Sequence, residues 1–181
     1  ETDGPERGVL LYREQFVFDV FPGSPQLAST PVVLPDGSEI QAEVAANFSE
    51  RQRGLMFREF MPADQGMLFL FSSTATWRFW MLNTYIPLDI LWLNEDREIT
   101  FINAHTLPCP SGNSCPTYGP NEPSRFVLEL NAGEAAKRGL KVGDRLVKVA
   151  GRSADELEFG ELRERLAGLI DDAAHDRLEG P

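Results

Sequence analysis

Residues 86–93, Ile-Pro-Leu-Asp-Ile-Leu-Trp-Leu, constrain the fold more than any other segment of the chain. Successive side chains of a strand point to opposite faces, and both faces of this segment are apolar. This pattern is typical of a central strand that is buried on both sides. Asp89 interrupts the apolar run. Because an unpaired buried carboxylate is costly, Asp89 must be exposed, paired or hydrogen-bonded.

Strand patterns occur along much of the chain. Residues 32–34 and 39–44 flank the turn Pro35-Asp36-Gly37, and the second segment alternates apolar with polar residues. This predicts a hairpin with one solvated face. Further strands are predicted at residues 66–71, 77–82, 87–93, 98–105, 125–130 and 145–149.

Two short helices interrupt these strands. Ser49 and Gln52 have the spacing of a capping box, and Gly54 can end the helix that they begin. A second short helix is predicted over residues 132–138, where Gly139 stops it.

The end of the chain has a different character. Ser153 and Glu156 have the spacing of another capping box, and apolar residues recur at helical spacing from Leu162 to Ala173. This predicts an amphipathic C-terminal helix. We expect it to dock on the domain, and an oligomerisation or partner-binding role is the alternative.

The predicted fold is mainly β (α+β): a compact antiparallel β barrel or sandwich with two short helices and a C-terminal amphipathic helix. The chain of 181 residues is long enough to bury a core without a metal or disulfide framework. We divide it into an N-terminal extension (1–30), a main β domain (31–150) and a C-terminal helical extension (151–181).

The formal net charge of −11 disfavours some partners. An acidic surface repels phosphate backbones and anionic headgroups, so we do not expect a nucleic-acid ligand. Apolar runs such as 67–71 are far shorter than the ~20 residues of a membrane span, and no transmembrane segment is predicted. The chain begins at Glu1 rather than Met, which fits either a removed leader or a trimmed sequence.

The chain has two cysteines, Cys109 and Cys115, in a loop rich in Pro and Gly. Their closeness suggests a local disulfide, and such a bond persists only in an oxidising compartment. Unpaired thiols and a metal site that includes His105 are the alternatives. The spacing does not match paired zinc ligands, and no fourth ligand is evident, so no metal is predicted.

The densest group of unusual side chains lies between Trp77 and Ile90. Two interpretations remain open for it. In the first, Arg53 or Arg58 forms a structural ion pair with Asp89 and pins the first helix onto the sheet. In the second, these groups line a pocket that binds a small polar ligand. The candidate ligand-binding residues are Arg53, Arg58, Trp80, Asn83, Asp89 and Tyr118.

Standard catalytic and cofactor motifs do not occur. The sequence has no Gly-x-Ser-x-Gly elbow, Walker loop, His-Glu-x-x-His or dinucleotide fingerprint. We therefore predict no catalytic residues and no cofactor. Asp89 and Glu129 are the acids that could act together as an acid–base pair.

Residues 37–149 resemble the bacterial and archaeal family called domain of unknown function 192. The resemblance implies a compact, mainly β domain without an assigned activity, in proteins that are exported or lipid-anchored. Where the family commonly carries Lys after Phe-Trp-Met, this chain has Leu82, so no cation is expected there. The matching motifs are Gly54-Leu55-Met56 with Arg58, Gly66-Met67-Leu68-Phe69, Phe79-Trp80-Met81, Asn83-Thr84, Ile86-Pro87-Leu88-Asp89-Ile90, Val127 to Gly133, and Gly143-Asp144.

Together these observations predict an extracytoplasmic, non-catalytic module, periplasmic or secreted, with a lipid anchor through a removed leader left open. Its expected partner is a small polar ligand, for example a saccharide, or an envelope protein. The alternatives are a carboxylate-dependent hydrolase and a structural or assembly protein that acts through the C-terminal helix. The sequence does not indicate an oligomeric state.

Overall fold

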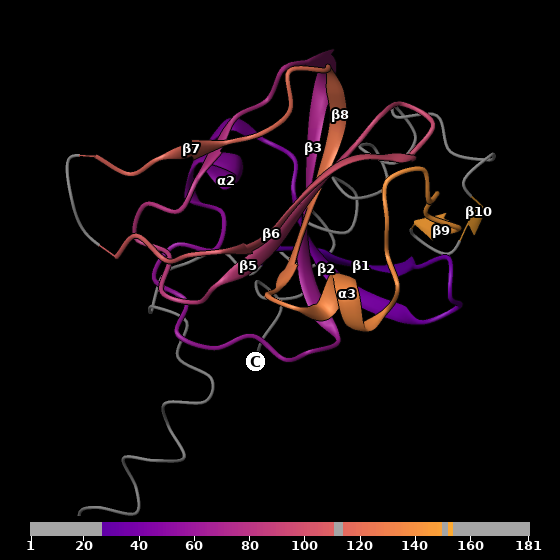
Figure 1. Ribbon diagram of the computed structural model, residues 1–181, viewed down its shortest axis with the longest axis horizontal. Helices are drawn as coiled ribbons and strands as arrows, with labels where there is room; N and C mark the ends of the chain where they lie inside the picture. The colour runs from indigo at the N-terminus through magenta and orange to yellow at the C-terminus, as the bar shows by residue number, and fades with distance from the viewer. Residues whose placement is uncertain (1–26, 111–113, 150–151, 154–181) are drawn as a thin grey trace, which may run out of the picture.

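The computed structural model describes residues 27–110, 114–149 and 152–153 (Figure 1). The main-chain elements in this part of the chain are mostly strands. They are β1 (Ser29–Val33), β2 (Glu39–Ala45), α2 (Phe48–Arg53), β3 (Gln65–Ala75), β4 (Phe79–Trp80), β5 (Leu88–Leu93), β6 (Ile99–Thr106), β7 (Thr117–Tyr118), β8 (Ser124–Asn131), α3 (Glu134–Lys137), β9 (Lys148–Val149) and β10 (Arg152–Ser153).

One strongly twisted sheet runs through the molecule in the order β10-β9-β1-β2-β3-β8-β5-β6, and β4 and β7 form a separate small sheet (Figure 1). The predicted mainly β fold is confirmed. The arrangement is sandwich-like, and the sheet does not close into a barrel. The segment before β9 bonds to both β6 and β1, since the Ile99 N–H donates to the Asp144 carbonyl at 2.7 Å and the Val147 N–H donates to the Val33 carbonyl at 2.9 Å.

The prediction that all pairings are antiparallel is wrong at one position, because β2 and β3 run parallel. The chain between them passes through α2, and a crossover of this length is what a parallel pair needs. The hairpin of β1 and β2 is antiparallel as expected, with Val32 opposite Ile40.

β5 is the buried central strand that its sequence predicts, since all six of its residues are buried. It lies between β8 and β6, and its alternate side chains enter two separate cores. The first core, on one face, contains Val32, Leu34, Ile40, Ala42, Val44, Leu68, Leu70, Leu91, Leu93, Ile99, Leu128, Leu130, Ala135, Leu140 and Leu146. The second core, on the other face, contains Ala45, Leu55, Met61, Met67, Phe69, Phe71, Met81, Ile86, Leu88, Ile90, Trp92 and Val127.

Asp89 points to the first-core side of β5 and is fully buried. Its Oδ1 accepts a hydrogen bond from the backbone N–H of His105 at 2.8 Å. Its Oδ2 accepts from the N–H groups of Gly133 at 2.9 Å and Ala135 at 3.0 Å. Gly133 has a φ of 88°, a conformation that glycine adopts without strain. The carboxylate therefore fastens the end of β6 and the start of α3 to the central strand.

This arrangement corrects the predicted ion pair between Asp89 and Arg58. Three backbone donors already fill the carboxylate, and Arg58 pairs with Glu43 instead.

The first helix begins two residues earlier than predicted. Asn47 is the N-cap of α2, because its side chain accepts from the Glu50 N–H while the Glu50 carboxylate accepts from the Asn47 N–H. The helix ends at Arg53, and Gly54 follows with a φ of 47°. Two predicted strands are shorter than expected, since only 79–80 of 77–82 and 148–149 of 145–149 are extended.

The predicted C-terminal helix over 162–173 lies outside the described residues, as does most of the N-terminal extension. Within the described part of the chain, no helix combines the length and apolar character needed to cross a membrane.

We expect the substitution Asp89→Asn to lower the free energy of unfolding by about 2–4 kcal/mol, since it leaves buried N–H groups without an adequate acceptor. Urea unfolding followed by circular dichroism measures this. Asp96→Asn is the matched control, because Asp96 is exposed. Equal stability of the two variants would contradict the assigned role of Asp89.

Candidate functional site

Two exposed aromatic side chains, Phe57 and Tyr85, meet on the surface of the domain. They are 41% and 40% exposed, respectively. Their ring centroids lie 6.1 Å apart with an interplanar angle of 80°, an edge-to-face contact. We call these two residues the aromatic pair.

Backbone hydrogen bonds join three loop segments at the aromatic pair. The Phe57 N–H donates to the Asn83 carbonyl at 2.7 Å, and the Asn83 N–H donates to the Cys109 carbonyl at 2.9 Å. The Cys109 N–H in turn donates to the Met81 carbonyl at 3.3 Å. The segments around residues 57, 83 and 109 therefore form one connected surface structure.

Phe57 and Asn83 both adopt left-handed backbone conformations, with φ of 64° and 54°. Asn tolerates this conformation, whereas a bulky residue such as Phe is strained in it. Strained residues of this kind persist where the surrounding structure fixes them, and they often occur at functional sites. The strain at Phe57 directs attention to this surface.

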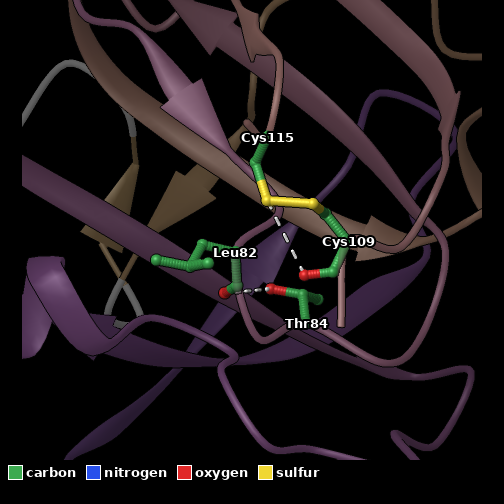
Figure 2. Close-up of a disulfide and its surroundings, with 4 residues drawn as sticks. All are labelled: Leu82, Thr84, Cys109 and Cys115. Atoms are coloured by element: carbon green, nitrogen blue, oxygen red, sulfur yellow. Dashed lines mark hydrogen bonds between the residues drawn. A yellow bond between two sulfur atoms is a disulfide. The ribbon is translucent and has the colours of Figure 1, made fainter. Parts of the chain in front are cut away.

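A disulfide joins Cys109 and Cys115, in agreement with the prediction, and its S–S distance is 1.99 Å. Figure 2 shows it beside Leu82 and Thr84, which flank Asn83 in the sequence. Leu82 also forms an isolated β-bridge with Cys109. Because each sulfur is bonded to the other, neither is a metal ligand here. The described residues contain no group of three or more His, Cys, Asp or Glu that could hold a metal ion.

Arg58 follows Phe57 and forms a two-bond ion pair with Glu43 of β2. Its Nη1 lies 2.5 Å from Glu43 Oε1, and its Nη2 lies 2.9 Å from Oε2. Both side chains are partly exposed, at 20% and 25%. The ion pair thus fixes the orientation of the guanidinium group that follows Phe57 in the chain.

The other predicted ligand-binding residues are distributed differently. Trp80 is 51% exposed on β4, and Tyr118 of β7 lies opposite Phe79 and packs against the second core. Arg53 ends α2 and is partly buried. Asp89 is fully buried on the other side of the sheet, so a ligand at the surface does not reach it.

Glu129 of β8 is a buried acid on the second-core face. Its direct neighbours on β3 and β5 are Met67 and Ile90, both fully buried and apolar. No described residue donates a hydrogen bond to its carboxyl group. Burial raises the pKa of Glu129 to about 8, so the group is mostly protonated at neutral pH.

Asp89 and Glu129 do not form the acid–base pair that the hydrolase alternative requires. Across β5 and β8, Asp89 lies opposite Leu130 and Ile90 lies opposite Glu129. Directly opposed residues share a face and successive residues alternate, so the two acids lie on opposite faces of the sheet. A hydrolase that uses these two carboxyl groups together is therefore ruled out.

Sequence comparison supplies the family. Residues 32–148 match DUF192, described as "Uncharacterized ACR", over more than half of the chain. The chain belongs to this family. The DUF192 match confirms the resemblance carried by the sequence motifs. No protein of curated function matches the chain.

Two solved structures resemble this DUF192 domain. One, titled a putative transcription regulator from Sinorhizobium meliloti 1021, is 36% identical with a TM-score of 0.63, and the match covers 72% of this chain and 100% of that one. The other, titled a protein of unknown function from Novosphingobium aromaticivorans DSM 12444, is 34% identical with a TM-score of 0.60, covering 70% and 89%.

Sequence reasoning missed Phe57, Tyr85 and Glu43 as members of this surface. Glu43 alternates with apolar residues in a hairpin and looks like an ordinary solvated residue. Phe57 gave no signal, because neither its left-handed conformation nor its contact with Tyr85 has a local sequence signature. Asn83 itself was predicted, since Asn often occupies such tight connections.

The raised pKa of Glu129 predicts a pH dependence of stability. A carboxyl group whose pKa is higher in the folded than in the unfolded state destabilises the fold as pH rises between the two values, which here are about 4.5 and about 8. Relative to Glu129→Gln, the wild type should lose roughly 3 kcal/mol of unfolding free energy between pH 5 and pH 8. Urea unfolding at a series of pH values measures this, and parallel curves for the two proteins would contradict it.

Proposed function

We propose that this DUF192 domain is an extracytoplasmic, non-catalytic binding module that holds a neutral saccharide on the surface of the aromatic pair. The observation that carries the proposal is the exposed Phe57–Tyr85 contact on loops that are strained, cross-linked and tied together by backbone hydrogen bonds.

A saccharide suits this surface for chemical reasons. The C–H faces of a sugar ring are apolar and pack against aromatic rings, while its hydroxyl groups need polar partners at the edge. Arg58 follows Phe57 in the chain and is paired with Glu43, and Asn83 accepts a backbone hydrogen bond from Phe57, so these polar residues can serve those hydroxyls. Ligand sites commonly combine aromatic walls with a few oriented polar groups in this way.

The disulfide supports the proposed compartment. Disulfides form and persist in oxidising environments such as the periplasm or outside the cell. Cys109 also holds the Asn83 connection through two backbone hydrogen bonds, so the cross-link stabilises the surface that we propose as the binding site.

Other partners fit the chain less well. The S. meliloti relative is titled a putative transcription regulator, but the net charge of −11 on this chain opposes binding to nucleic-acid phosphates. An envelope protein could also use an exposed aromatic surface, and the experiment below separates that partner from a saccharide. An assembly role for residues 151–181 concerns a segment of which the structure describes only 152–153.

Titration with cellotetraose, maltotetraose and chitotetraose, followed by isothermal calorimetry, tests the proposal. We expect at least one of them to bind, and Phe57→Ala and Tyr85→Ala each to weaken that binding at least tenfold, because each removes one ring of the contact. Phe60→Ala is the matched control, since Phe60 is 74% exposed and lies outside the aromatic pair.

The control variant should bind as the wild type does. Absence of binding to all three oligosaccharides, or equal losses in the Phe60 and Phe57 variants, would contradict the proposal. Binding of an envelope protein in place of these sugars would favour the alternative partner.

A further inference from the structure

We propose that the small β4–β7 sheet carries a second binding site, which takes an oligosaccharide with a carboxylate on one of its sugar rings. The site is the exposed side of this sheet formed by Arg78, Trp80 and Thr117, which we call the outer face. It shares no residue with the aromatic pair and does not rest on the proposed function.

Trp80 and Thr117 lie side by side on the outer face. Phe79 and Tyr118 are opposite each other in the small sheet, and both pack against the second core. Because successive side chains of a strand point to opposite faces, the next pair, Trp80 and Thr117, points away from that core. Both residues are exposed. Directly opposed residues lie about 5 Å apart between Cβ atoms, so an open indole ring has a hydroxyl group beside it.

Arg78 is exposed as well, and two backbone carbonyls orient its guanidinium group. Its Nη1 donates to the Gly119 carbonyl at 2.6 Å, and its Nη2 donates to the Thr117 carbonyl at 3.1 Å. The second bond brings the guanidinium group to the residue opposite Trp80. A guanidinium group has more N–H donors than these bonds use, so the others can serve a ligand.

The charge of Arg78 is not neutralised within the described part of the chain. No carboxylate among the described residues forms an ion pair or hydrogen bond with it, whereas Arg58, for example, pairs with Glu43. This is notable in a chain with 28 acidic and 17 basic residues. An oriented guanidinium group without a carboxylate partner suits an anionic ligand, because hydrogen bonds between ionised groups are the stronger ones.

The disulfide and a backbone hydrogen bond fasten the two strands that form the outer face. The Cys109 N–H donates at 3.3 Å to the carbonyl of Met81, which follows Trp80. The disulfide joins Cys109 to Cys115, two residues before Thr117. The cross-link thus connects the end of β4 with the segment that enters β7. A surface that is fixed before binding loses little conformational entropy when a ligand binds.

A sugar ring with a carboxylate matches these three side chains. Its C–H face packs on the indole ring of Trp80, its hydroxyl groups reach Thr117, and its carboxylate binds Arg78. The net charge of −11 repels dense polyanions. A saccharide with a carboxylate on every second sugar carries less charge than a nucleic acid, and salt screens the acids that lie beyond a Debye length of about 8 Å.

Isothermal calorimetry of the full chain with a hyaluronan tetrasaccharide, in which glucuronate alternates with N-acetylglucosamine, tests this inference. We expect the wild type to bind it, and Trp80→Ala and Arg78→Gln each to weaken binding about tenfold or more. Phe60→Ala and Arg145→Gln are the matched controls and should bind as the wild type does. Phe60 is another exposed aromatic residue, and Arg145 is another exposed arginine that donates to a backbone carbonyl.

The methyl ester of the same tetrasaccharide separates a charge contact from a structural role of Arg78. The ester keeps the sugar rings and removes the negative charges, so the wild type should bind it about tenfold more weakly. Arg78→Gln should then weaken binding of the ester by no more than about twofold. Equal losses for the acid and the ester would show that Arg78 only supports the small sheet, and the inference would fail.

Three other results would overturn the inference. The first is no binding of the tetrasaccharide by the wild type. The second is binding that Phe57→Ala weakens and Trp80→Ala does not, which would place the ligand at the aromatic pair and leave the proposed function standing. The third is binding of a tetraglutamate peptide in place of the tetrasaccharide, lost in the Trp80 and Arg78 variants, which would assign the outer face to an acidic protein.

Discussion

The hydrogen bonds to Asp89 are the interaction on which the rest of the structure depends. A strand buried on both faces has few ways to accommodate a carboxylate, and this fold surrounds it with three backbone N–H groups from two different segments. Those segments are the end of β6 and the start of α3, which are distant from β5 in sequence. These hydrogen bonds offset the desolvation cost of burying the carboxylate, and they fix the two segments against β5.

The alternation of side chains along the sheet places Asp89 and Glu129 on opposite faces. Asp89 lies on the face where α3 supplies donors, and its carboxylate is fully used within the fold. Glu129 lies on the other face, where Met67 and Ile90 offer it nothing polar. Leu55 and Ile86, from the loops that carry Phe57 and Tyr85, pack into the core on the same face. The structure thus separates an acid that three backbone N–H groups bind from one to which no described residue donates a hydrogen bond, and the proposed binding surface lies on the side of the second.

Much of this fold follows from sequence patterns, and the exceptions have physical causes. The doubly apolar pattern of 86–93 correctly predicts a buried central strand, and Pro35-Asp36-Gly37 correctly predicts a hairpin. The partners of Asp89 could not be predicted, because backbone N–H groups belong to every residue except proline and leave no signature. Arg58 looked suitable for Asp89 by charge, but Glu43 is on the face that Arg58 reaches.

Local competition explains the error at the first helix. Asn47 with Glu50 and Ser49 with Gln52 are both capping boxes by spacing, and the first pair begins the helix. The parallel β2–β3 pairing depends on where α2 packs, which no local pattern reveals. The motifs of the DUF192 family identified the domain, yet they gave no indication of the aromatic pair, which exists only through contacts between separate loops.

Amide hydrogen exchange of His105, Gly133 and Ala135 tests the central role of Asp89 most directly. If their N–H groups are fixed by the buried carboxylate, they should exchange only through global unfolding, with opening free energies equal to that of the slowest core amides of β5 and β8. Exchange close to the rate of an unprotected amide at these three positions would contradict this account of the fold.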